Sequence, residues 1–148
     1  MKIVVDTNVI VSRLMSPAGT PARVLRLWRE AAFDLLVSSA ILDEYQRVVH
    51  YPSVRVRIWL SDDGLAQFLA GFRRFGLFVE PDPLPLVVQA DPTDDMFLAC
   101  AVSGGADYVV SGDRHLLQVR EYRGIPILSP AVFLAVLERR PGGAAGAE

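Results

Sequence analysis

Four acidic residues, far apart along the chain, occupy positions from which they could meet and bind a metal ion. Asp6 directly follows a short β-branched run typical of a buried strand, and Asp113 lies just past a second such run. Glu44 and Asp95 fall in the first turns of two predicted helices. In a parallel α/β sheet, the ends of strands and the starts of the following helices share one edge, where ligands bind. The sequence therefore predicts that these four carboxylates converge there.

Such a cluster has a specific chemical consequence. Two like charges about 4 Å apart repel by about 4 kcal/mol at an effective dielectric constant of about 20. A fold tolerates the cluster only if cations neutralise it or protons stay bound. Oxygen ligands, with no cysteine-built site and no suitable histidine pair, favour Mg²⁺ or Mn²⁺ over zinc. Two such ions would activate a water molecule and stabilise the leaving oxygen of a phosphodiester.

Helical phase selects among neighbouring acids. In the helix expected at residues 39–50, Glu44 lies at the border of the buried stripe, whereas Asp43 points away. In the later helix Asp95 shares a face with apolar residues. Asp94 occupies the place of a first-turn acid that complements the helix dipole. We therefore expect Glu44 and Asp95, rather than Asp43 and Asp94, to face the rest of the domain instead of solvent.

Each acid also has a simpler explanation. Asp6 could cap the helix after it, and Asp113 could cap a short turn. Asp95 could complement a helix dipole, and Glu44 could be a solvated charge at the flank of its helix. Taken singly, these explanations are at least as good as metal binding. Their convergence on one edge favours the metal site.

The order of apolar runs and helix signals indicates the fold class. Short β-branched or apolar runs predict strands at residues 2–5, 34–37, 77–80, 108–110 and 126–128. Amphipathic stretches with capping signals predict helices beginning near residues 7, 20, 39, 61, 91 and 129. This alternation favours an α/β protein, a three-layer α/β/α sandwich around a mostly parallel sheet. We expect a single domain over residues 1–140 and a disordered tail at 141–148.

Composition narrows the cellular setting. The 148 residues contain one cysteine, no run of about 18 apolar residues and no signal peptide. We therefore expect a soluble, cytoplasmic protein without a membrane segment or an internal disulfide. The net charge of −2 gives no basic signature of nucleic-acid binding. However, Lys2 is the only lysine among the 15 lysine and arginine residues. Arginine suits phosphate contacts, and codon bias explains its excess equally well.

Four sequence blocks resemble a known family. The blocks VVDTNVIVSRL, VSSAILDEYQRVV, DPTDDMFLACA and ADYVVSGDRHLL are similar, in this order, to the signatures of the PIN-domain nucleases. The resemblance spans about residues 2–137 and is greatest to PIN proteins classed as toxins, the VapC-type ribonucleases. It implies a PIN-like fold and an endoribonuclease that uses Mg²⁺ or Mn²⁺ to hydrolyse RNA phosphodiesters. It also implies a homodimer and a cognate antitoxin whose C-terminal segment blocks the active site.

Residue by residue, the resemblance assigns catalytic and metal-binding roles to the predicted acids. Asp6, Glu44 and Asp95 match the three core acids of the family, and Asp113 matches the fourth. Asp94 is a neighbouring candidate, but Asp95 has the family spacing before Leu-Ala.

Two polar residues and two arginines complete the predicted site. Asn8 and Ser111 match positions that support the acids by hydrogen bonding; Ser111 replaces the threonine of many relatives and keeps the hydroxyl. Arg114, beside Asp113, is the arginine best placed for an RNA phosphate, and Arg13 is the next.

Other functions remain open. A phosphoaspartate enzyme also places an aspartate after its first strand, but it needs a later lysine, and Lys2 is the only lysine. A dehalogenase-like enzyme needs a second aspartate where this chain has Asn8. A PIN-like module that binds RNA or protein without cutting, and a DNA-directed or RNA-processing nuclease, stay as alternatives. RNA is preferred because the chain lacks the insertions of larger structure-specific relatives.

Overall fold

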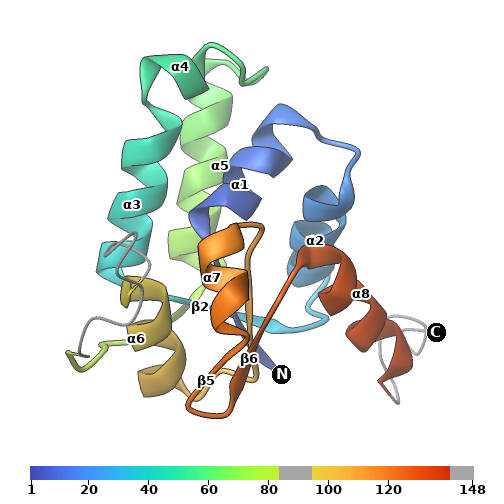
Figure 1. Cartoon of the computed structure of the whole chain (residues 1–148). Coiled ribbons are helices and arrows are strands. Elements are labelled where there is room, and N and C mark those ends of the chain that lie inside the picture. The colour runs from blue at the N-terminus through green and yellow to red at the C-terminus, as the bar shows by residue number, and fades with distance from the viewer. Residues whose placement is uncertain (84–94, 141–148) are drawn as a thin grey trace.

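The structure, a computed structural model, describes residues 1–83 and 95–140 and alternates strands with helices (Figure 1). The strands are β1 (Lys2–Val5), β2 (Asp34–Val37), β3 (Leu77–Phe78), β4 (Tyr108–Val110), β5 (Glu121–Tyr122) and β6 (Ile125–Leu128). The helices are α1 (Thr7–Met15), α2 (Thr20–Arg29), α3 (Ser39–Val49), α4 (Pro52–Arg55), α5 (Asp62–Phe75), α6 (Asp95–Gly104), α7 (Arg114–Val119) and α8 (Pro130–Arg139).

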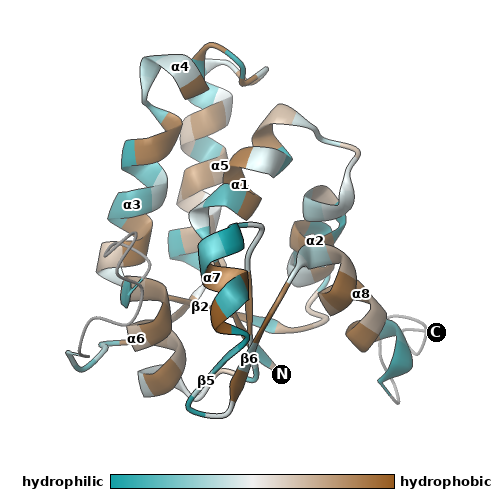
Figure 2. Cartoon of the chain, in the orientation of Figure 1, coloured by the Kyte–Doolittle hydropathy of each residue, from teal (hydrophilic) through white to brown (hydrophobic). Residues whose placement is uncertain are grey.

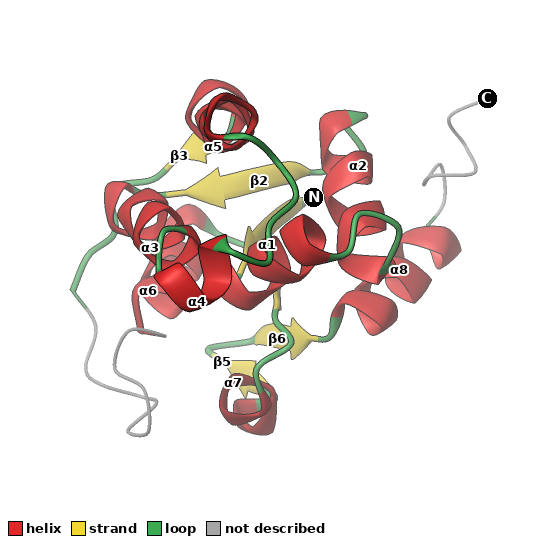
Figure 3. Ribbon diagram, turned by 90° about the horizontal axis from the view of Figure 1, so that it is seen from above, coloured by secondary structure: helices red, strands yellow, loops and turns green. Residues whose placement is uncertain are grey.

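The strands form a six-stranded sheet in the order β3-β2-β1-β4-β6-β5. All neighbouring pairs are parallel except β5 with β6. Helices flank the sheet, with α6 packed against β1, β2 and β4 and with α2 packed against α8 at the opposite side of the view (Figure 3). The predicted α/β/α architecture is therefore confirmed.

The central strand explains why the sheet forms. Ile3, Val4 and Val5 of β1 are completely buried, as expected for a β-branched strand covered on both faces. Burying each such side chain stabilises the fold by about 1.5–3 kcal/mol. Most helices present an apolar stripe towards the sheet, whereas α6 is apolar around most of its surface (Figure 2). The middle of the sheet is thus a rigid support for the loops that follow β1 and β4.

Several elements differ in detail from the sequence prediction. Strand β3 has two residues instead of the four predicted, although the Val79 amide still donates to the Val37 carbonyl at 2.8 Å. Strand β5 was not predicted, since its two residues carry no apolar pattern. Pro52 ends α3 as expected but also begins α4, where proline suits the first turn.

Part of the sequence prediction falls outside residues 1–83 and 95–140. This applies to most of the segment between the strand expected at residues 77–80 and the helix expected near residue 91, to the start of that helix and to the tail at 141–148. The division of the chain at residue 140 stays a prediction. Within the part of the chain that the structure describes, no helix is both long and apolar enough to cross a bilayer.

Candidate active site

The carboxyl ends of β1 and β4 meet at the point where the strand order reverses. After β3 the chain crosses β2 and β1 and adds β4 on the other side of β1. The amide of Asp6, just past β1, donates to the carbonyl of Val110 at 2.9 Å, so the two strand ends stay paired. Ligands of open α/β sheets bind at such a switch point. Asp6 therefore lies where the topology favours a site.

A single hydroxyl group connects Asp6 with Asp113. The Ser111 Oγ donates to the Asp6 Oδ2 at 2.6 Å, and the same Oγ accepts from the Asp113 amide at 2.9 Å. Ser111 is completely buried and Asp6 is 4% exposed. A carboxylate at this depth requires hydrogen-bond donors or a cation. Ser111 thus has the supporting role that its place in the sequence predicted.

Asn8 ties α1 to the loop after β4. Its Oδ1 accepts from the Gly112 amide at 3.0 Å, across 104 residues of sequence. Together, Asn8 and Ser111 fix the loop that carries Asp113 against the start of α1. Ser111 bonds directly to the Asp6 carboxylate, whereas Asn8 bonds to the backbone of the loop next to Asp113, and support of the acids by Asn8 stays a prediction.

The capping explanations give different results for the two aspartates. Asp113 does cap α7, because its Oδ1 accepts from the His115 amide at 3.1 Å. Asp6 is the N-cap residue of α1 by backbone geometry, yet its side chain makes no capping hydrogen bond. Capping therefore accounts for Asp113 in part and does not account for Asp6.

Glu44 lies at the border of the buried face of α3, as helical phase predicted. Its side chain is only 11% exposed, whereas Asp43 is exposed. The Glu44 Oε1 accepts from the Arg47 Nε at 3.1 Å, one turn further along the helix. The carboxylate is thus inward in position and paired with an arginine of its own helix.

Tyr45 joins α3 to the end of β1. Its hydroxyl donates to the Val5 carbonyl at 2.5 Å, directly before Asp6. Burial raises the pKa of Tyr45 well above its usual value, and the Asp6 carboxylate and then Cys100 raise it further. The phenol therefore stays protonated and keeps donating. A buried tyrosine needs a partner for its hydroxyl, and this was the signal in the sequence that could have identified Tyr45.

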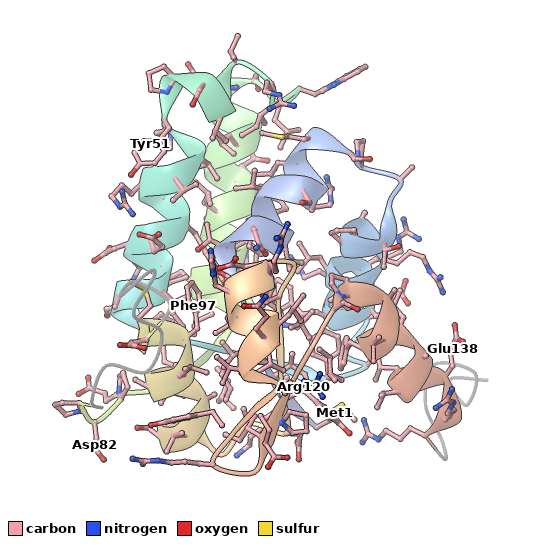
Figure 4. The ribbon with its side chains drawn as sticks, in the orientation of Figure 1. Met1, Tyr51, Asp82, Phe97, Arg120 and Glu138 are labelled. Atoms are coloured by element: carbon pink, nitrogen blue, oxygen red, sulfur yellow. The ribbon has the colours of Figure 1, made fainter. Side chains whose placement is uncertain are left out.

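Asp95 is the first residue of α6 that the structure describes, and it is partly buried. Helix α6 packs against β1, β4 and α3. Phe97, labelled in Figure 4, stacks on Tyr45 with ring centroids 6.5 Å apart. The start of α6 therefore adjoins the helix that carries Glu44. Asp94 lies outside the described residues.

This geometry agrees with the comparison to known proteins. Residues 2–115 match the PIN domain family. The chain belongs to the PIN domain family. It is also 27% identical over 121 residues to the uncharacterized protein MJ1680 of Methanocaldococcus jannaschii, covering 82% of this chain and 76% of that protein. PIN domains are generally nucleases and typically use divalent metal ions.

The donor set of this PIN domain fits a hard divalent cation in chemistry but is not assembled as a closed site. Among residues 1–83 and 95–140, no three acidic, histidine or cysteine side chains are close enough to hold one ion. Asp6 and Asp113 are linked through Ser111, whereas Glu44 is oriented towards Arg47. Thr7, beside Asp6, adds a buried hydroxyl oxygen for which the described residues offer no hydrogen-bond partner.

The two predicted RNA-contact arginines lie at different places in the PIN domain. Arg114 is exposed at the first position of α7, next to Asp113. Arg13 lies in the last turn of α1, with its guanidinium 5.5 Å from the centre of the Phe68 ring. Only Arg114 is therefore immediately beside the candidate acids.

Proposed function

We propose that this PIN domain is an Mg²⁺- or Mn²⁺-dependent endoribonuclease and the toxin component of a type II toxin–antitoxin pair. The observation that carries the nuclease proposal is the Asp6 carboxylate. It is buried at the switch point of the sheet, it does not cap α1, and a buried hydroxyl fixes its orientation. A buried, oriented carboxylate at a ligand-binding edge of the sheet is suited to hold a divalent cation.

Asp6, Glu44, Asp95 and Asp113 are the residues that would hold the metal. When bound, the metal supplies a water molecule of lowered pKa and charge stabilisation at the phosphodiester. Three other residues hold the segments that carry these acids. Ser111 and Asn8 hold the Asp113 loop, and Tyr45 holds the end of β1 before Asp6. Arg114 is placed to contact an RNA phosphate near the acids.

The toxin role, the homodimer and the antitoxin are part of the same proposal, as is a cytoplasmic location. Support for a subunit contact comes from Phe75, Leu77 and Phe78, which are 50%, 44% and 45% exposed. They lie at the end of α5 and in β3, which is one of the two edge strands of the described sheet. Exposed apolar residues gathered at one edge are typical of an interaction surface.

The nuclease proposal is tested by incubating the purified chain with labelled single-stranded RNA. Cleavage should require Mg²⁺ or Mn²⁺ and stop with a chelator. Asp6→Asn should reduce the rate by about 10³-fold or more, the scale seen for loss of a central catalytic group. Asp34→Asn, an exposed acid at the start of β2, is the matched control and should cut normally. Equal cutting by Asp6→Asn and the wild type would contradict the mechanism.

The toxin role needs separate measurements. Induced expression of the chain in bacteria should arrest growth, and Asp6→Asn should relieve the arrest. Sedimentation should show a dimer that Leu77→Glu weakens. A monomer at high concentration, with no antitoxin reading frame beside the gene, would count against the toxin role and leave the nuclease chemistry intact.

A further inference from the structure

A second candidate binding site lies away from the acids, in a cavity of about 330 Å³ between α1, α2 and α5. Three arginines, Arg13, Arg26 and Arg29, line it. Its apolar wall includes Trp28 and Phe68. The cavity thus combines cationic groups with aromatic surface, in contrast to the acidic edge of the sheet.

Among the described residues, none of the three arginines forms an ion pair, although Arg26 also lines a neighbouring cavity with Glu30 and Glu138. No described residue that lines the cavity is acidic. The ion pairs found across residues 1–83 and 95–140 involve Arg23, Arg47 and Arg55, which are all outside the cavity. Three cationic groups around an apolar pocket favour an anionic ligand with a less polar body.

Aromatic rings support two of the guanidinium groups. Arg13 lies over Phe68, and Arg29 lies over Phe75 with 3.9 Å between the guanidinium carbon and the ring centroid. Arg29 is also 5.5 Å from the Trp28 ring centre. A planar guanidinium can stack with a planar group on each of its two faces. Unpaired RNA bases stack on arginine planes and aromatic rings in this way.

Helix α1 connects this cavity with the candidate active site. Asp6 precedes the first residue of α1, and Arg13 lies in the last turn. The separation of seven positions corresponds to about 10 Å along the helix axis, at roughly 1.5 Å per residue. A single RNA strand held at the acids could therefore reach the cavity within a few nucleotides.

We propose that this cavity is a nucleotide subsite that takes an unpaired base of the RNA strand, with the neighbouring phosphates on Arg13, Arg26 and Arg29. Gln67, which lines the cavity, is placed to hydrogen-bond the base edge. This inference rests on the proposed function and extends it to substrate binding. Because nucleobases stack on arginine planes and aromatic rings, the lining of the cavity favours a nucleotide over an acidic peptide.

The test is RNA binding without cleavage. A short fluorescein-labelled single-stranded RNA of mixed sequence is titrated by anisotropy in the presence of a chelator, at several salt concentrations. Arg13→Gln and Arg29→Gln should each weaken binding roughly fivefold to tenfold. Each should also reduce the slope of log affinity against log salt by about 0.7, the value for one phosphate contact to a single strand.

The matched control is Arg23→Gln on α2, which removes the same charge but pairs with Glu138 outside the cavity. It should leave the affinity within about twofold, because an exposed pair contributes little. Equal losses for Arg23→Gln and Arg29→Gln would reduce the effect to net charge and overturn the subsite. Unchanged RNA affinity in the cavity variants, with lost binding of a labelled acidic peptide, would also overturn it.

The outcome is separable from that of the proposed function. If the wild type does not cut RNA with Mn²⁺, yet the cavity variants lose affinity and salt slope, the nuclease proposal fails and the subsite remains. If the wild type cuts RNA and the cavity variants bind RNA normally, the nuclease proposal remains and the subsite fails.

Discussion

The two ends of α1 hold opposite charges by different means. At its start, the Asp6 carboxylate is buried and accepts a hydrogen bond of 2.6 Å from a buried serine. At its end, Arg13 is partly exposed and lies over the Phe68 ring. The first arrangement is directional and tied to the backbone of two strands. The second depends on side-chain stacking, which tolerates displacement.

This difference indicates a division of labour. Reacting groups must be held within a fraction of an ångström, which hydrogen bonds on rigid strand ends achieve. A site that binds flexible single-stranded RNA must accommodate different bases, and base stacking is tolerant of sequence. The acid edge is thus suited to chemistry, and the arginine cavity is suited to holding substrate. Three substitutions test this contrast.

The largest effect is expected at the acid edge. Ser111→Ala removes the donor to Asp6 and the acceptor of the Asp113 amide. The free energy of unfolding should fall by about 2 kcal/mol, and RNA cleavage should fall at least about tenfold. Urea denaturation and cleavage rates at saturating metal measure both. Ser129→Ala, which removes only the cap of α8, should lower stability without lowering activity; equal activity of the two variants would remove the special role of Ser111.

An intermediate effect is expected at Tyr45. Tyr45→Phe keeps the ring packing against Phe72 and Phe97 but loses the hydrogen bond to Val5. Unfolding free energy should fall by about 1 kcal/mol. The Mn²⁺ concentration for half-maximal cleavage should rise a few-fold, because the strand end before Asp6 is less fixed, while the maximal rate changes less. A metal requirement identical to that of the wild type would limit Tyr45 to a packing role.

The smallest effect is expected in the cavity. Phe68→Leu removes the ring beneath the Arg13 guanidinium without changing the charge. RNA affinity should fall about twofold to fivefold, as for loss of a cation–π contact of about 0.5–1 kcal/mol. Cleavage at saturating RNA should not change, since the acids are untouched. A slower maximal rate with unchanged affinity would reverse the proposed division between the two ends of α1.

Much of this arrangement could be predicted from the sequence because its signals are local. The β-branched run before Asp6 predicts a buried strand, and the serine cap before α3 fixes the phase that places Glu44 inward. The order of these elements then determines the edge at which Asp6 and Ser111 meet. Periodicity and capping depend on neighbours within one turn, so one chain is enough to read them.

The parts that could not be predicted depend on contacts between distant segments. The cavity forms from three helices whose spacing no local pattern records, so Arg13 could be named only as a candidate contact. The bond from Tyr45 to Val5 joins residues 40 positions apart. Strand β5 exists because it pairs with β6, and its sequence alone has no strand signature. The assembly of the four acids around one ion stays a prediction.

The ion pair between Glu44 and Arg47 has a consequence for ionic strength. Arg47 is 50% exposed, so added salt weakens its attraction for Glu44, while the buried Asp6 is screened much less. If a divalent cation displaces Arg47 from Glu44, added salt weakens the ion pair between Arg47 and Glu44. It also weakens the attraction of Glu44 for the incoming cation. The two influences oppose each other. The metal concentration for half-maximal cleavage should then vary little between dilute and physiological buffers, even where the affinity for RNA falls steeply.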